Sequence, residues 1–309
     1  MPDVYDSIKI IYIAGTGRNG STLIGNILAE VPYVISIGEL RYLWRDLYFK
    51  HQCGCGREIN SCDFWSECIR EAFGSLSKSD LQSLVFSTEK LTRRFGVSRR
   101  EDEGQARSKS DPAELVKAFE AVYKAVRVVS NRKVVVDSSK TPLFEKFIIS
   151  RLPYPVYTVH LIRDPRATSY SWTTRKNTLD PAEPFLPQFN VFSTAFGWMT
   201  WNIVVEMNKN KNYFRLLYEK WADKPQDSVE EIMRFADVIP PRAPLFSGRT
   251  IELNEHHTVS GNPVRFIKGR LEVKADERWR RSMPFHQQLL VLAETWPLFI
   301  KYYYFKRKN

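Results

Sequence analysis

A glycine-rich turn between an apolar strand and a helix constrains this chain more than any other feature. An apolar run at 10–14 leads directly into Gly15-Thr16-Gly17-Arg18-Asn19-Gly20-Ser21-Thr22, and helical spacing continues to residue 28. Glycines let the backbone curl so that several N–H groups point inward, and the start of the helix adds a partial positive charge. The sequence therefore predicts an anion site at the end of this strand.

The turn resembles the nucleotide-triphosphate P-loop only in its first half. Gly15 and Gly20 have the spacing of that motif, but Ser21 stands where the motif requires a lysine. Arg18 lies inside the loop instead. We therefore expect a phosphate-type site, and an ordinary ATPase or kinase is disfavoured.

Net charge and hydrophobic content indicate what kind of protein this is and what it binds. The 309 residues carry a formal net charge of +11 and are 43% hydrophobic, which favours a folded protein with anionic partners. No apolar run approaches the roughly 18–20 residues that span a bilayer. The first six residues do not resemble a secretory signal. We expect a cytoplasmic protein without a transmembrane segment.

Strand-like and helix-like patterns alternate along the chain, which predicts a three-layer α/β fold. We expect it to be P-loop-like, with a central parallel sheet flanked by helices. We expect one domain over 1–309, with a cysteine-containing insertion at about 50–70 and a mobile loop at about 96–111. Apolar runs predict strands at 10–14, 34–37, 134–136, 156–162 and 214–218. Periodic patterns predict helices at 63–73, 79–94, 112–130, 165–176, 190–208, 225–236 and 284–304.

Three of the predicted strands end in polar residues suited to an anion. Since the carboxyl ends of parallel strands meet at one sheet edge, where ligands bind, these residues are expected to converge. The residues are Arg18, Ser21, Thr22, Ser138, Ser139, Lys140, Arg163, Ser169 and Ser171.

Two of these segments resemble the donor motifs of sulfotransferases that use 3′-phosphoadenosine 5′-phosphosulfate (PAPS), of the bacterial type and with similarity to tyrosylprotein sulfotransferases. Residues 17–23 resemble the 5′-phosphosulfate loop, and 161–171 resemble the 3′-phosphate motif. The resemblance implies PAPS as sulfuryl donor and 3′-phosphoadenosine 5′-phosphate (PAP) as product. It implies donor contacts by Gly17, Arg18, Asn19, Gly20, Ser21, Thr22, Arg163, Ser171, Arg175, Tyr218, Arg265, Lys268 and Gly269.

The same resemblance implies the catalytic residues. Glu39 lies in a Gly-Glu stretch similar to that of tyrosylprotein sulfotransferases, where the glutamate is the general base. Lys140 matches the lysine that neutralises the bridging oxygen, and Arg18 can add charge there. The alternatives are a helix-start glutamate, a solvated lysine, and His256 or His257 as the base.

The four cysteines lie close together in the sequence, at Cys53, Cys55, Cys62 and Cys68. Four thiolates could hold a structural zinc, but this spacing is not a standard zinc pattern. We favour buried reduced thiols, with zinc and a disulfide as the alternatives.

Two further segments have open interpretations. The helix predicted at 190–208 is rich in aromatic residues, and we favour a core helix over one that lines an acceptor pocket. The basic, aromatic tail at 302–308 is a candidate for peripheral membrane contact.

The sequence thus predicts a sulfotransferase that acts on a hydroxyl or amine of an acceptor, with no metal in the chemistry. A small-molecule kinase and a non-catalytic binder of nucleic acid or another polyanion are the alternatives. Polysaccharide, lipid, peptide and other small-molecule acceptors all fit. Nucleic acid is not an expected partner, because no RNA- or DNA-binding motif is present.

Overall fold

The computed structural model describes residues 8–92, 112–175, 177, 184–239 and 244–305. The loop expected at about 96–111 and the basic end of the tail lie outside these residues. No helix of the described part is long and apolar enough to cross a membrane.

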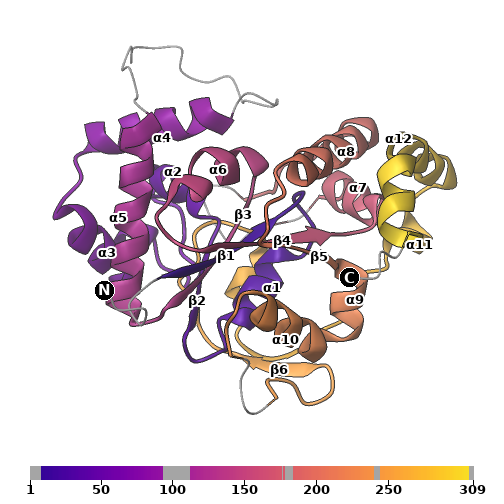
Figure 1. Cartoon of the computed structure of the whole chain (residues 1–309). Helices are drawn as coiled ribbons and strands as arrows, with labels where there is room; N and C mark the ends of the chain where they lie inside the picture. Colours follow the sequence, from indigo (N-terminus) through magenta and orange to yellow (C-terminus); the bar gives the residue numbers. More distant parts are fainter. Residues whose placement is uncertain (1–7, 93–111, 176, 178–183, 240–243, 306–309) are drawn as a thin grey trace.

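A five-stranded sheet forms the centre of the fold, in the order β2-β3-β1-β4-β5 (Figure 1). All four neighbouring pairs are parallel. The predicted α/β fold, with a central parallel sheet flanked by helices, is confirmed. The strands are β1 (Lys9–Ala14), β2 (Val34–Gly38), β3 (Val134–Lys140), β4 (Val156–Ile162) and β5 (Tyr213–Leu217).

The central strand β1 is apolar from Ile10 to Ala14, where both of its faces are covered. Ile10 and Tyr12 belong to one hydrophobic core, and Ile11 and Ile13 belong to the other. Figure 1 shows α6 (Pro142–Phe147) above the sheet and α1 (Ser21–Leu28) below it. A strand buried on both faces reads as a continuous apolar run, as this one does.

The remaining helices surround the sheet and extend beyond β5. They are α2 (Leu43–Phe49), α3 (Asp63–Phe73), α4 (Lys78–Thr92), α5 (Pro112–Ser130), α7 (Pro165–Thr173), α8 (Val191–Met207), α9 (Tyr218–Asp223), α10 (Pro225–Phe235), α11 (Trp279–Ser282) and α12 (Phe285–Tyr303). Short 3₁₀ turns lie at Leu40–Tyr42, Ile59–Ser61, Ile149–Arg151 and Pro263–Phe266.

The structure differs from the predicted elements in a few places. Helix α7 ends at Thr173 rather than near residue 176, and Tyr218 begins α9 rather than ending β5. An antiparallel pair, β6 (Thr250–Leu253) and β7 (Gly269–Glu272), was not predicted. Each of these strands has only four residues, too short for an alternating pattern to be recognised.

The strand order positions the site. The chain leaves β1 for β2 on one side of the sheet, whereas β4 pairs with β1 on the other side. Ligands bind at such a switch point, outside the carboxyl ends of the strands. The ends of β1, β3 and β4 meet there.

His160 of β4 is a core residue, as its apolar surroundings predict. Its Nδ1 lies 2.6 Å from the Tyr213 hydroxyl, and its Nε2 lies 2.7 Å from Oδ1 of Asn202, which accepts. Complete burial lowers the pKa of His160 to about 4.

This burial predicts a pH-dependent contribution to stability. Between the unfolded pKa of about 6.5 and the native value the unfolded chain binds more protons, so acidification favours unfolding. Relative to His160→Gln, the wild type should lose about 3 kcal/mol of unfolding free energy between about pH 7 and pH 4. Denaturant unfolding at several pH values measures this difference, and parallel profiles for the two proteins would contradict it.

Candidate functional site

A cavity of about 810 Å³ opens at the carboxyl edge of the sheet. Its walls come from the glycine loop, the ends of β2, β3 and β4, helices α7 and α8, and the segment 260–266. This volume lies within the range of small-molecule binding sites.

The glycine loop is held against the end of β4 by close backbone packing. Gly15 has a φ of 133°, and a Cβ there would lie 2.5 Å from the Leu161 carbonyl oxygen. The side chain of Asn19 donates to the same oxygen at 2.9 Å and accepts from the Ser21 amide at 3.2 Å. Gly20, in the left-handed region, caps α1. The loop therefore leads Ser21 and Thr22, which line the cavity, into the first turn of α1.

A buried ion pair lies in the cavity wall where β2 and β3 end. Lys140 Nζ is 2.5 Å from Glu39 Oε1, and the exposed fraction of each residue is below one tenth. The lysine also donates to the Ser138 carbonyl oxygen at 3.1 Å. Burial lowers the pKa of Lys140, and the Glu39 carboxylate partly offsets this shift. The amide of Glu39 donates to the Val259 carbonyl oxygen at 2.8 Å, which fixes its backbone.

Arg18 lies across the cavity wall with its guanidinium 4.5 Å from the centre of the Trp172 ring. Burial lowers its pKa to about 10, still far above neutrality. Its buried Nε finds no acceptor among the described residues. Arg18 therefore offers a charged, partly unsatisfied donor to a ligand.

Arg163 follows β4 and is fixed from three sides. It donates to the Arg18 carbonyl oxygen at 3.1 Å and to the Asp276 carbonyl oxygen at 2.9 Å, and it packs over the ring of Tyr218 at 4.6 Å. Its Nε has no acceptor in the described structure. Ser171 of α7, the helix that follows Arg163, also lines the cavity.

The cavity wall is strongly cationic. Such a surplus of fixed positive charge, with orphaned N–H groups among it, suits a polyanionic ligand. The lining basic residues of the described chain are Arg18, Arg41, Arg45, Lys140, Arg163, Arg265 and Arg278, and the acidic ones are Glu39, Asp46 and Asp276.

Most of the residues expected from the sequence come together here. Those that line the cavity are Gly17, Arg18, Gly20, Ser21, Thr22, Glu39, Lys140, Arg163, Ser171, Tyr218 and Arg265. Asn19 does not line it, because its side chain is bonded to the Leu161 carbonyl oxygen of β4 and to the Ser21 amide.

Three more of the expected donor contacts lie outside the cavity lining. Arg175 is exposed and stacks on Phe185 at 3.8 Å. Lys268 pairs with Glu255 on the surface, and Gly269 begins β7. The segment 260–266 lines the cavity instead, and its Arg265 donates to the Gln52 carbonyl oxygen at 3.0 Å.

Neither candidate histidine base lines the cavity. His256 Nε2 lies 2.9 Å from Glu30, and the His257 ring is turned toward Cys53 and Cys62. Glu39 is the carboxylate that lies beside Lys140.

Several lining residues were missed from the sequence. Arg41 follows Glu39 by two positions, so it was within reach of the same motif. Thr168 lies inside the segment 161–171 and was within reach of the motif found there. Asp276 and Arg278 carry no local pattern, because long-range packing brings them to the cavity.

The aromatic helix α8 is the core helix that we favoured on one side only, where Ala195, Trp198 and Val205 are buried. Trp198 is buried, with its indole N–H donating to the Arg163 carbonyl oxygen at 2.9 Å, but Phe196 and Met207 are 62% and 78% exposed. Phe196 and Trp201 line the cavity, so one face of α8 offers an apolar wall.

Comparisons with known proteins give only distant structural similarity. No family model matches the chain, and no curated protein does. Among solved structures, the sulfotransferase domain from the Synechococcus PCC 7002 olefin synthase is 17% identical, with 96% of each chain covered and a TM-score of 0.49. The sulfotransferase domain from the curacin biosynthetic pathway is 15% identical, with 93% of this chain and 97% of that chain covered and a TM-score of 0.49. The sulfotransferase STF1 from Mycobacterium tuberculosis H37Rv is 13% identical, with 77% and 70% covered and a TM-score of 0.42.

The glycine loop gives a test by stability. Gly15→Ala should lower the free energy of unfolding by about 2–4 kcal/mol, since it combines an unfavourable φ with a backbone overlap. Gly197→Ala, within α8 and with open space around its Cβ position, should leave stability unchanged or raise it by about 0.5–1 kcal/mol. Denaturant unfolding compares the two, and equal effects would contradict the packing described here.

Proposed function

We propose that this protein is a sulfotransferase that transfers a sulfuryl group from PAPS to a hydroxyl or amine of an acceptor. One observation carries the proposal: the buried Lys140–Glu39 pair, 2.5 Å apart, lies in a cationic cavity beside a P-loop-like turn that lacks its lysine. A P-loop kinase takes its cation from the loop and from magnesium. Here the lysine comes from the end of the neighbouring strand.

PAPS carries two anionic groups, and the cavity lining contains two sets of residues that would bind them. Ser21 and Thr22 at the start of α1 would hold the 5′-phosphosulfate, where free backbone N–H groups and the helix dipole favour negative charge. Arg163 and Ser171 would hold the 3′-phosphate, and an arginine presents a fixed fork to phosphate oxygens. PAPS itself would supply the activated sulfur–oxygen bond.

The catalytic residues would have different roles in the transfer. As the acceptor oxygen or nitrogen forms its bond to sulfur, the bond from sulfur to the bridging oxygen breaks, and the electron pair stays on the leaving phosphate. Glu39 would take the acceptor proton. Lys140 and Arg18 would offset the charge that develops on the phosphate.

The acceptor would approach along the aromatic wall. Phe196 and Trp201 of α8 line the same cavity as Glu39 and offer apolar surface in it. An acceptor with an apolar portion next to its hydroxyl or amine fits this wall.

The base and the lysine can be tested by turnover. With an acceptor identified by screening with [³⁵S]PAPS, Glu39→Gln should lower turnover by about 10²–10⁴-fold, because the variant cannot accept the proton. Lys140→Met should lower turnover by about 10²–10³-fold, because methionine has a similar shape but no charge to stabilise the leaving phosphate.

The matched control is Glu145→Gln. Glu145 is also buried but lies outside the cavity lining, and burial raises its pKa to about 7, so an uncharged amide suits its place. Its turnover should stay within about threefold of wild type. Full activity in Glu39→Gln would overturn the assignment of the base, and transfer of the γ-phosphate of ATP to the acceptor would favour a kinase.

The 3′-phosphate contact can be tested by binding of PAP. Arg163→Gln should weaken PAP about 10–100-fold, the loss expected for a charge-assisted hydrogen bond. Arg249→Gln, an exposed arginine paired with Asp223 on the surface, should bind PAP like wild type. Calorimetric titration measures both, with thermal melting to check folding. Equal affinity of Arg163→Gln and wild type would contradict the assignment.

A further inference from the structure

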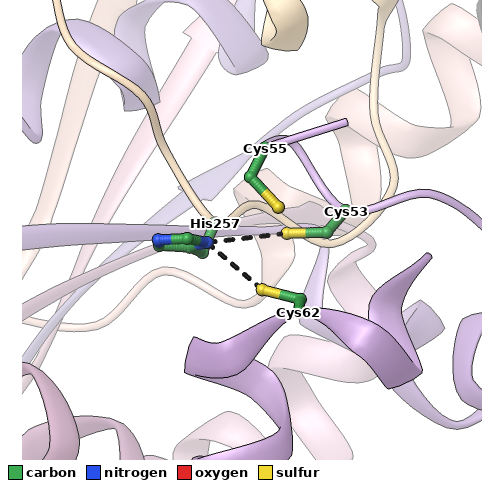
Figure 2. A group of neighbouring side chains, drawn as sticks. All are labelled: Cys53, Cys55, Cys62 and His257. Atoms are coloured by element: carbon green, nitrogen blue, oxygen red, sulfur yellow. Dashed lines mark hydrogen bonds between the residues drawn. The ribbon is translucent and has the colours of Figure 1, made fainter. Parts of the chain in front are cut away.

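A cluster of sulfur and nitrogen atoms forms away from the cavity, between two segments distant in the sequence. Cys53, Cys55 and Cys62 meet His257, which lies 195 residues after Cys62. Their three Sγ atoms and one imidazole nitrogen all lie within 4.8 Å of one another. Figure 2 shows the three sulfur atoms and the His257 ring pointing toward a common point. Cys68 is not part of the group, so the set of four thiolates considered from the sequence is wrong.

We propose that Cys53, Cys55, Cys62 and His257 bind a structural zinc ion. Zinc in proteins is tetrahedral, with bonds of about 2.3 Å to sulfur and about 2.0–2.1 Å to nitrogen, which puts a sulfur and a nitrogen ligand about 3.6 Å apart. His257 Nδ1 lies 3.2 Å from the Cys62 sulfur and 4.0 Å from the Cys53 sulfur, on either side of this value. All four cysteines are free thiols.

The surroundings hold the ligands in place. The His257 ring stacks on Phe64 at 5.2 Å, and the indole N–H of Trp65 donates to the His257 carbonyl oxygen at 2.8 Å. Cys62 caps the start of α3, where the helix dipole favours a thiolate. Such outer contacts fix the orientation of metal ligands. Cys53 and Cys62 are fully buried, and Cys55 and His257 are partly exposed.

Zinc is the ion that this ligand set favours. Three thiolates and one imidazole are soft to intermediate ligands, and closed tetrahedral sets of this kind are typical of structural zinc. Binding would deprotonate the three thiols and release their three protons to water, with no change of oxidation state. A disulfide would instead require an oxidant.

The zinc would hold the segment from His257 to Asn262 against the candidate active site. Gly54 donates its amide to the Thr258 carbonyl oxygen at 2.9 Å, and Val259 exchanges backbone hydrogen bonds with Ile37 and Glu39. A few residues further on, the amide of Asn262 lies 3.3 Å from Thr22 Oγ1. The ion would therefore tie the cysteine segment to the strand end that carries Glu39, while taking no part in the chemistry.

Elemental analysis of the full-length protein tests the proposal. Protein expressed with zinc in the medium and desalted should contain about one zinc ion per chain. Cys62→Ser and His257→Gln should each lose most of it. Cys68→Ser is the matched control, since Cys68 is equally buried in the same segment, and it should keep about one zinc ion per chain.

A second measurement on the wild type covers variants that fail to fold. Alkylation of the native protein before and after treatment with a zinc chelator, followed by peptide mapping, should show Cys53, Cys55 and Cys62 becoming reactive while Cys68 changes little. A wild type without zinc would overturn the proposal, as would labelling unchanged by the chelator. A non-reduced mass lower by two hydrogen atoms would assign a disulfide instead.

Discussion

The buried ion pair between Lys140 and Glu39 is the interaction on which the rest of the site depends. Desolvation of two charges is costly, and their attraction offsets this cost only where geometry and further hydrogen bonds are favourable. The structure meets both conditions, because β2 and β3 are neighbours in the sheet and end side by side, and Lys140 also donates to the Ser138 carbonyl oxygen. Removing one partner of such a pair leaves the other buried without compensation, typically at a cost of about 3–5 kcal/mol.

The cationic cavity surrounds this pair, and the segment around Val259 holds its glutamate. The surrounding arginines make the resting cavity rich in positive charge, so a polyanion that binds there would relieve repulsion and stabilise the fold. The Val259 backbone holds Glu39 from the outer side, through hydrogen bonds that the proposed zinc cluster would support. The candidate donor site and the proposed metal site would thus act on the same strand end from two directions.

Much of the fold could be predicted because local patterns dominate it. The strand at 156–162 and the helices at 63–73 and 112–130 have the predicted bounds, since apolar runs and helical periodicity determine burial there. The glycine loop could be located because it follows a buried strand, and Lys140 because it ends one. These signals are short-range, so a single sequence is enough to recognise them.

The remainder depends on contacts that local patterns do not contain. Asn19 was expected to contact the donor, yet its amide is used by the Leu161 carbonyl oxygen, 142 residues away. Lys268 and Arg265 are equally basic in the sequence, and only the turn at Pro263–Phe266 directs Arg265 into the cavity. Cys68 shares the cysteine segment, but the fourth member of the cluster is His257.

We propose above all that the cavity holds a nucleotide with a separate 3′-phosphate, without magnesium. Calorimetric titration of the wild type with PAP and with ADP, both in the presence of EDTA, measures this most directly. The two ligands have the same number of phosphates and differ in where the second one is attached. PAP should bind about 10–100-fold more tightly than ADP, as expected for an arginine-bound 3′-phosphate. Equal or tighter binding of ADP, or binding of PAP only after magnesium is added, would contradict the account.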